Sequence, residues 1–80
     1  MITYDELLNI IEDALELPEG SIKNGIEDEL AEKWDSLGHL SILIKLDQAL
    51  DGRCNSITDL GNAYRIDTIS DILKREGLMN

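Results

Sequence analysis

Ser36 and His39 are the residues of this chain whose types and spacing come nearest to catalytic chemistry. Residues three apart on a helix are neighbours, so the imidazole would be placed to accept the proton of the hydroxyl. A serine hydrolase also needs a strained nucleophile elbow, an oxyanion hole and an orienting acid. The chain has no Gly-x-Ser-x-Gly pattern and little room for a substrate pocket. We therefore do not expect catalysis by this pair.

Metal and phosphate sites are not indicated either. A calcium loop needs acidic residues at alternate positions, a central glycine and a final glutamate. Neither residues 27–35 nor residues 47–59 have that pattern. Cys54 and His39 fall short of the roughly four ligands of a structural zinc site. The glycines are scattered, and no Gly-Lys-Ser/Thr unit is present to hold a nucleotide phosphate.

The net charge of −10 restricts the partners. Residues 1–35 hold eleven acidic side chains and two lysines, whereas residues 36–80 hold six acidic and five basic side chains. Such charge repels nucleic acid and anionic lipid, and it speeds encounter with basic proteins. There is no apolar run of membrane-spanning length and only one cysteine, Cys54, and the first residues lack the basic stretch and apolar core expected of a signal sequence. We expect a cytoplasmic monomer that contacts other proteins but neither nucleic acid nor membrane.

The first half of the chain is predicted to be one long helix and a long loop. Thr3 and Glu6 have the spacing of a capping box, so the helix begins at Thr3 and runs to about Leu17, before Pro18. Residues 18–35 are predicted to be mostly loop, with a short helical turn at residues 27–33. The apolar residues of this loop should pack on the core: Ile22, Ile26 and Leu30.

Three further helices follow in the prediction. One begins at Ser36 with Asp35 or Ser36 as its N-cap and runs to Leu50, before Gly52. A short, weak one covers about residues 56–63, and the last begins at Thr68, capped with Asp71, and ends near Arg75. Residues 1–80 should thus form a single all-α domain. It is a small four-helix bundle with a long loop between the first and second helices and a short third helix.

The helix over residues 36–50 has apolar residues on two roughly opposite sides. With about 100° per residue, one side is broad enough to face the core. It consists of His39, Ile42, Leu43, Leu46, Ala49 and Leu50. The other side consists of Leu37, Leu40 and Ile44. A small domain needs only one apolar face for its core, so the second is left for the surface or a partner.

Ser36 is a candidate attachment point for a phosphate-linked group. A helix N-terminus stabilises negative charge, because its first amide groups are free and the helix dipole is positive there. Asp35-Ser36 is also an ordinary capping pair, which is the simpler interpretation of the two residues alone. The apolar side formed by Leu37, Leu40 and Ile44 begins at the same helix end, and this favours attachment.

Together these features resemble the acyl carrier proteins and other phosphopantetheine-dependent carriers, over nearly the whole chain. The resemblance rests on the acidic first helix, the long loop, Asp35-Ser36-Leu37 at the start of the second helix, and the weak third helix. It implies that Ser36 bears a covalent 4′-phosphopantetheine arm, taken from coenzyme A by a magnesium-dependent phosphopantetheinyl transferase. Acyl groups would be held on the arm as thioesters, and the chain would be a carrier and not a catalyst.

The resemblance also implies roles for neighbouring residues. Asp35 would aid recognition by the transferase. Acyl-transferring, synthase or ligase enzymes would dock on Leu37, Leu40 and Ile44. The core of the bundle would shelter the acyl chain, lined by residues such as Leu46, Ala49 and Ile69.

The chain departs from the carriers of primary fatty acid biosynthesis, whose second helix is rich in acidic residues. Here Gly38 and His39 follow Leu37, and the body of the helix holds only Asp47 against Lys45. Apolar contact should therefore contribute more to docking. Trp34–Leu40 looks more like the specialised stand-alone bacterial carriers that serve lipid, polysaccharide or secondary-metabolite assembly.

Two alternatives stay open. The cargo is an acyl group in our first interpretation, but an aminoacyl, peptidyl, D-alanyl or polyketide carrier would use the same serine. The chain would otherwise be a non-carrier acidic helical interaction module. For three residues the simpler structural roles are favoured: His39 as a partly buried packing residue, Trp34 as an anchor of the loop, and Cys54 as an incidental thiol able to oxidise to a dimer.

Overall fold

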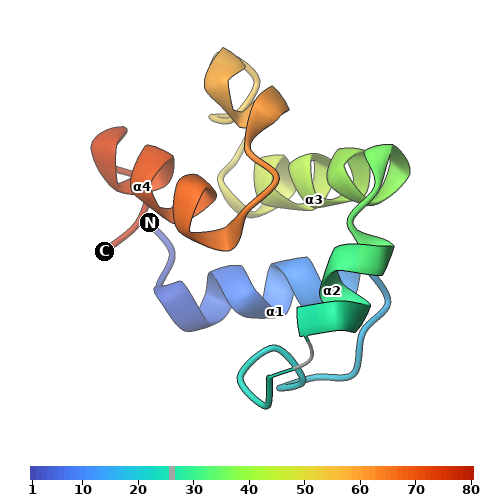
Figure 1. Cartoon of the computed structure of the whole chain (residues 1–80). Coiled ribbons are helices and arrows are strands. Elements are labelled where there is room, and N and C mark those ends of the chain that lie inside the picture. Colours follow the sequence, from blue (N-terminus) through green and yellow to red (C-terminus); the bar gives the residue numbers. More distant parts are fainter. Residues whose placement is uncertain (26) are drawn as a thin grey trace.

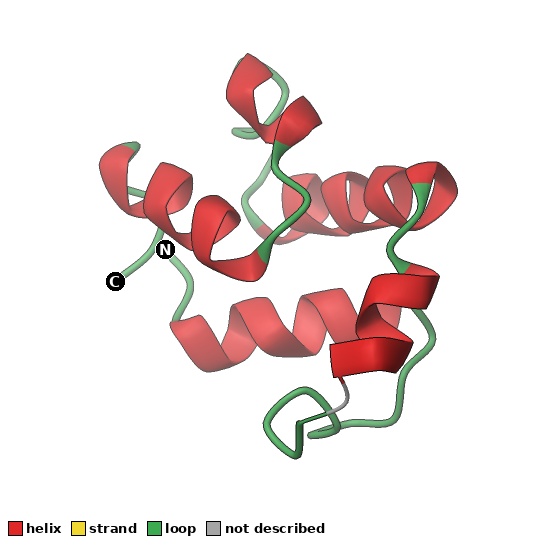
Figure 2. Ribbon diagram, in the orientation of Figure 1, coloured by secondary structure: helices red, strands yellow, loops and turns green. Residues whose placement is uncertain are grey.

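The computed structural model describes residues 1–25 and 27–80, with the side chains of residues 27 and 28 left out of the description. Four α-helices and one 3₁₀-helix make up the described part, which contains no strand. They are α1 (Tyr4–Ala14), α2 (Glu27–Lys33), α3 (Ser36–Ala49), the 3₁₀-helix η1 (Thr58–Asn62) and α4 (Ile66–Arg75). Figure 2 shows this all-helical architecture, which confirms the predicted all-α class. The predicted packing of Ile26 lies outside the described residues.

The start of α1 is held by two sets of contacts. The Thr3 hydroxyl accepts from the Glu6 amide (3.2 Å) and the Glu6 carboxylate accepts from the Thr3 amide (3.1 Å), which confirms the predicted capping box. The Ile2 amide donates to the Leu78 carbonyl, and the Asn80 amide donates to the Ile2 carbonyl, each at 3.0 Å. The two chain ends consequently lie side by side (Figure 1), which the sequence analysis did not predict.

The end of α1 differs from the prediction. The last helical residue is Ala14, three residues before Leu17. Glu16 takes a left-handed conformation (φ 58°), and the Leu17 amide donates to the Glu12 carbonyl at 2.8 Å. This is a Schellman turn, which satisfies the free carbonyls at a helix end. The turn at Glu16 therefore ends the helix, and Pro18 is not the residue that terminates it.

A buried carboxylate anchors the connection between α1 and α2. Glu12 is only 2% exposed, and its two oxygens accept from the amides of Gly20 (3.1 Å) and Ile22 (3.0 Å). Ile22 and Leu30 pack against the core as predicted. Within the connection, α2 is a full helix of seven residues instead of the single turn expected from residues 27–33.

The core lies where α1, α3, η1 and α4 meet. Figure 1 shows α3 running back above α1 in the opposite direction, with α4 on one side and α2 across the other end of α1. The largest fully buried side chains come from all four of the meeting elements: Leu7, Ile11, Ile42, Leu46, Leu60, Ile69 and Leu73. Ala49, the last helical residue of α3, was predicted to face the core and is exposed.

The second half of the chain corrects two expectations. The weak third helix is the 3₁₀-helix η1. The last helix, α4, begins at Ile66 instead of Thr68, and no side chain caps it. Asp67 accepts from the Thr68 amide at 2.9 Å and pairs with Arg65, so a carboxylate in the first turn replaces the predicted Thr68–Asp71 box. The predicted end near Arg75 is confirmed, with Gly77 (φ 73°) just beyond it.

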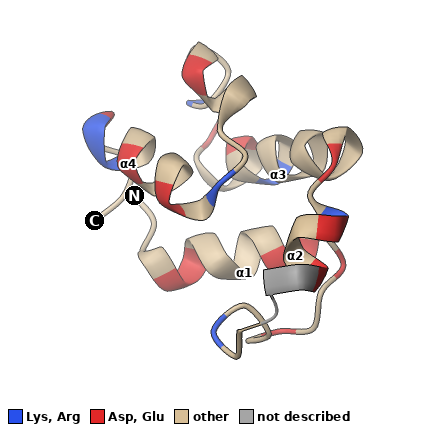
Figure 3. Cartoon of the chain, in the orientation of Figure 1, with Lys and Arg blue, Asp and Glu red and all other residues tan. Residues whose placement is uncertain are grey.

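Charged side chains are distributed unevenly over the fold. Figure 3 shows acidic positions on α1 and along the connection to α3, whereas basic positions are prominent at the two ends of α4. No helix of the described residues is both long enough and apolar enough to span a bilayer.

Candidate functional site

Ser36 is the first residue of α3 and is exposed. The N-cap is Asp35, whose Oδ1 accepts the Gly38 amide at 2.8 Å. This settles the alternative that the sequence left open between Asp35 and Ser36. The Ser36 hydroxyl is therefore not the group that caps the helix, and it lies at the surface of the helix end where the dipole favours negative charge.

Gly38 lies at a place where only glycine fits without movement. A Cβ atom built there would overlap the Lys33 carbonyl oxygen and lie 2.7 Å from Cδ2 of Leu15. The first turn of α3 thus packs directly on the end of α2 and on the residue that follows α1. From the sequence, Gly38 was expected only to set this chain apart from the carriers of primary fatty acid biosynthesis, and its packing role was not predicted. A glycine in the first turn of a helix is the one sequence feature that could have indicated this close packing.

His39 holds three parts of the chain together. The Trp34 indole Nε1–H donates to His39 Nδ1 at 3.0 Å, and His39 Nε2 lies 2.8 Å from the Leu60 carbonyl. Because Nδ1 accepts, the network assigns the proton to Nε2, which donates to Leu60. His39 is 3% exposed and uses both nitrogens within the protein. It is a packing residue, as predicted, and is not available as a base for Ser36.

Two aromatic rings flank His39. The Tyr64 ring stacks on it with centroids 4.0 Å apart and planes at 18°. Trp34 is buried at the Nδ1 edge of the imidazole, with centroids 6.2 Å apart, and so anchors the connection between α2 and α3 as expected. We call Trp34, His39 and Tyr64 the aromatic cluster. The roles of Tyr64 and Leu60 were missed, because nothing in a local pattern indicates contact between residues more than twenty positions apart.

The second apolar side of α3 lies on the surface. Leu37 is 75% exposed, Leu40 54% and Ile44 51%, whereas Ile42 and Leu46 on the opposite side are fully buried. We call Leu37, Leu40 and Ile44 the exposed stripe. It begins at the residue after Ser36 and follows one side of the helix for two turns. The three residues therefore form a continuous apolar surface next to an exposed hydroxyl.

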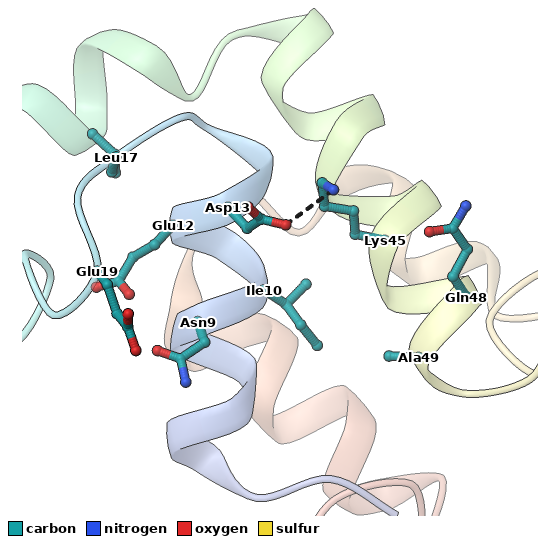
Figure 4. Close-up of a pocket in the computed structure, with 9 residues that line it drawn as sticks. All are labelled: Asn9, Ile10, Glu12, Asp13, Leu17, Glu19, Lys45, Gln48 and Ala49. Carbon is teal, nitrogen blue, oxygen red and sulfur yellow. Dashed lines mark ion pairs between the residues drawn. The ribbon is translucent and has the colours of Figure 1, made fainter.

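Several depressions surround this region. One, of about 460 Å³, is lined in part by Asp35, Leu37 and Gly38, on both sides of Ser36. Three more are found elsewhere on the fold. The α1–α3 groove, of about 680 Å³, lies beside Ile10 and Ala49, and a Lys45–Asp13 ion pair of 3.1 Å crosses it (Figure 4). The α3–η1 hollow, of about 230 Å³, is lined in part by Leu43, Cys54 and Ile57. The third, which we call the Trp34 hollow, has about 560 Å³. It is lined by Leu30, Ala31, Trp34, Tyr64, Arg65, Ile66 and Asp67.

Cys54 is not placed for chemistry. The side chain is buried, and this burial, with a smaller contribution from the Asp47 carboxylate, raises the pKa of the thiol. A thiol with a raised pKa forms little thiolate and reacts slowly. Burial also argues against the oxidation to a dimer that the sequence analysis considered. In the part of the chain that the structure describes, no three potential metal ligands come together, and every buried side-chain nitrogen or oxygen has a hydrogen-bond partner.

No protein-family model, curated protein or solved structure shows significant similarity to this chain.

Proposed function

We propose that this chain is an acyl carrier protein that bears a 4′-phosphopantetheine arm on Ser36. The observation that carries the proposal is the placement of Ser36. It is exposed at the start of α3, the capping role belongs to Asp35, and the exposed stripe begins at the next residue. A helix with one purely structural apolar face would not need the stripe, whereas a carrier needs a surface for its partner enzymes beside the attachment point.

The residues present fit the attachment of such a group. The Ser36 oxygen would form a phosphodiester bond to the phosphorus of the arm while the pyrophosphate bond of coenzyme A breaks. Adenosine 3′,5′-bisphosphate leaves, and the hydroxyl proton passes to a base of the transferase. The amide end of α3 favours the added negative charge. When attached, the arm supplies a terminal thiol that holds an acyl group as a thioester.

The exposed stripe defines the kind of partner. Leu37, Leu40 and Ile44 fit an apolar groove, and the exposed Asp35 carboxylate beside Ser36 fits a basic group at the edge of that groove. The partners would be a phosphopantetheinyl transferase and the acyl-transferring, synthase or ligase enzymes of a specialised cytoplasmic pathway of lipid, polysaccharide or secondary-metabolite assembly.

The direct test is intact-mass measurement after incubation with coenzyme A, magnesium and a promiscuous phosphopantetheinyl transferase. The wild-type chain should gain the mass of one arm, and Ser36→Ala should gain none. Ser41→Ala, five residues further along α3, is the matched control and should be modified like the wild type. A wild-type chain that gains no mass, or a Ser36→Ala variant that does, would refute the proposal.

The exposed stripe by itself favours a second candidate, a non-carrier module that binds one partner through α3. The two functions differ in what Ser36 does. In a carrier, Leu40→Asp should raise the KM for the transferase about tenfold or more, whereas Gln48→Asp on the same helix should leave it unchanged. In a binding module, Leu40→Asp should abolish partner binding while Ser36→Ala leaves function intact. Loading with aminoacyl and acyl ligases would distinguish an aminoacyl from an acyl carrier.

A further inference from the structure

The connection that leads into Ser36 is very short. The helix α2 ends at Lys33 and α3 begins at Ser36, so only Trp34 and Asp35 join the two helices. Ser36 does not cap α3 with its own side chain, since that role belongs to Asp35. The place of the Ser36 hydroxyl therefore depends on how firmly the two connecting residues are held.

His39 is bonded to both connecting residues. Its imidazole Nδ1 accepts the Trp34 indole N–H at 3.0 Å, and its backbone amide donates to the Asp35 carbonyl at 2.8 Å. The amide bond is the ordinary one of an α-helix. The imidazole bond exists only because the side chain of residue 39 offers an acceptor to Trp34. The chain is thus closed around Ser36, from Trp34 before it to His39 after it.

The imidazole is itself held from two further directions. Its Nε2 lies 2.8 Å from the Leu60 carbonyl of η1, and the Tyr64 ring is stacked on it with centroids 4.0 Å apart. The side chain of His39 is buried, so water does not compete for either nitrogen. A buried ring with two hydrogen bonds and a stacked neighbour has one defined orientation. His39 therefore ties the start of α3 to η1 and to the segment that follows it.

Gly38 and His39 restrain the first turn of α3 in different ways. The close approach of Gly38 to the Lys33 carbonyl and to Leu15 prevents the turn from moving nearer to α2. A steric contact of this kind resists approach but does not resist separation. The hydrogen bonds of His39 to Trp34 and Leu60 resist separation, so the two residues have complementary roles.

The transfer step proposed above depends on where the Ser36 oxygen lies. The attacking oxygen must approach the phosphorus nearly in line with the departing phosphate oxygen. A displacement of about 1 Å can cost on the order of 100-fold in rate. Ser36 is the first residue of α3, and helix ends fray. Docking on the exposed stripe, which begins at the next residue, does not by itself prevent this fraying.

From this arrangement we infer that His39 is a positioning residue for attachment of the arm. Through its bond to Trp34 it holds Ser36 where a transferase can use it, although both of its nitrogens are occupied and it takes no proton from the serine. The inference rests on the proposed carrier function and adds to it how the attachment residue is held. It goes beyond packing, because packing needs only a side chain of similar size, whereas positioning needs an acceptor toward Trp34 and a donor toward Leu60.

Two substitutions of His39 separate size from hydrogen bonding. His39→Leu fills a similar volume and bonds to neither partner. His39→Gln offers an amide oxygen to the Trp34 indole and an amide N–H to the Leu60 carbonyl. With coenzyme A saturating and the carrier varied, His39→Leu should lower the kcat of the promiscuous transferase about tenfold or more. KM should change less than about twofold, because the exposed stripe is intact, and His39→Gln should recover most of kcat.

Trp34→Phe tests the same hydrogen bond without altering His39. The phenyl ring remains apolar and lacks the indole N–H, so kcat should fall here too. The double variant Trp34→Phe/His39→Leu should have the kcat of His39→Leu alone, because both changes remove one interaction. Larger losses that simply add would show that the two residues act independently and would contradict the inference.

Tyr64→Leu and Tyr4→Leu form a matched pair. Each removes a tyrosine ring that is about half exposed, but only Tyr64 is stacked on the imidazole. Tyr64→Leu should lower kcat by a smaller factor than His39→Leu, because both hydrogen bonds of the imidazole remain. Tyr4→Leu, at the start of α1, should leave kcat and KM unchanged.

A control for stability distinguishes positioning from a general weakening of the fold. Ile72→Ala truncates a buried side chain of α4 that takes no part in the hydrogen bonds of the imidazole. It should lower the melting temperature and leave kcat unchanged at a temperature where it is folded. Hydrogen exchange at the Gly38 amide, which is bonded to the Asp35 cap, gives a second measurement. It should be about tenfold faster in His39→Leu than in the wild type and close to the wild-type rate in His39→Gln.

The outcomes separate the inference from the carrier function. A kcat of His39→Leu equal to that of the wild type would overturn the inference and leave the carrier function standing. The same holds for equal losses in His39→Leu and His39→Gln, for a loss in Ile72→Ala as large as in His39→Leu, and for a rise in KM alone. A wild-type chain that accepts no arm would refute both.

Discussion

The two sides of α3 consist of the same kinds of residue and have opposite environments. Ile42 and Leu46 are fully buried against α1, η1 and α4, whereas Leu40 and Ile44, two residues before each of them, are more than half exposed. Residue type therefore does not explain which side faces the core. The contacts of the neighbouring helices do, and the side they leave uncovered is free to bind another molecule.

The largest expected effect comes from equal truncations on the two sides. Leu46→Ala should lower the free energy of unfolding by about 2–5 kcal/mol, because it leaves a cavity in the core. Leu40→Ala should change it by less than about 0.5 kcal/mol, because the side chain is already half in water. Urea denaturation measures both. Equal losses would mean that the stripe is part of the core and would remove the basis for a docking surface.

A smaller effect on the free energy of unfolding is expected at Gly38, where the first turn of α3 packs on α2. Gly38→Ala should destabilise the fold by about 1–3 kcal/mol, because the added Cβ overlaps the Lys33 carbonyl and crowds Leu15. Gly61→Ala in η1 is the control, since nothing lies near the added atom, and it should be neutral or stabilising by up to about 1 kcal/mol. The comparison is made by thermal unfolding. A harmless Gly38→Ala would show that the start of α3 is loosely packed.

The smallest effect concerns pH and the buried thiol near the end of α3. The pKa of Cys54 is raised by burial and then by Asp47, so the folded state favours the neutral thiol. This contribution to stability is complete below the unfolded thiol pKa of about 8.5 and is lost as the pH rises through the folded value. Urea unfolding of the wild type and of Cys54→Ala should be compared between about pH 7 and 10. The free energy of unfolding should fall more steeply with rising pH in the wild type. Equal pH dependence of the free energy of unfolding in the two proteins would contradict this prediction. Alkylation of Cys54 in the folded protein as fast as in the unfolded chain would also contradict it.

Some helix boundaries could be predicted from the sequence and others could not, for a physical reason. The Thr3–Glu6 box and the Asp35 cap are contacts within four residues, so their spacing alone identifies them. The end of α1 depends on a left-handed Glu16, a conformation that its residue type does not favour. The N-cap of α4, Arg65, makes no side-chain capping bond, so the usual signal for a helix start is missing there.

The amino-acid sequence by itself determined the helical class of the fold, the capped start of each of the two longest helices, the two apolar sides of α3 and the candidate attachment residue. These depend on periodicity and on contacts between near neighbours. Only the tertiary structure decided how deeply each residue of α3 is buried, why Gly38 must be glycine, and that His39 joins Trp34 to Leu60. Those features arise from contacts between segments distant along the chain, whose meeting no local pattern specifies.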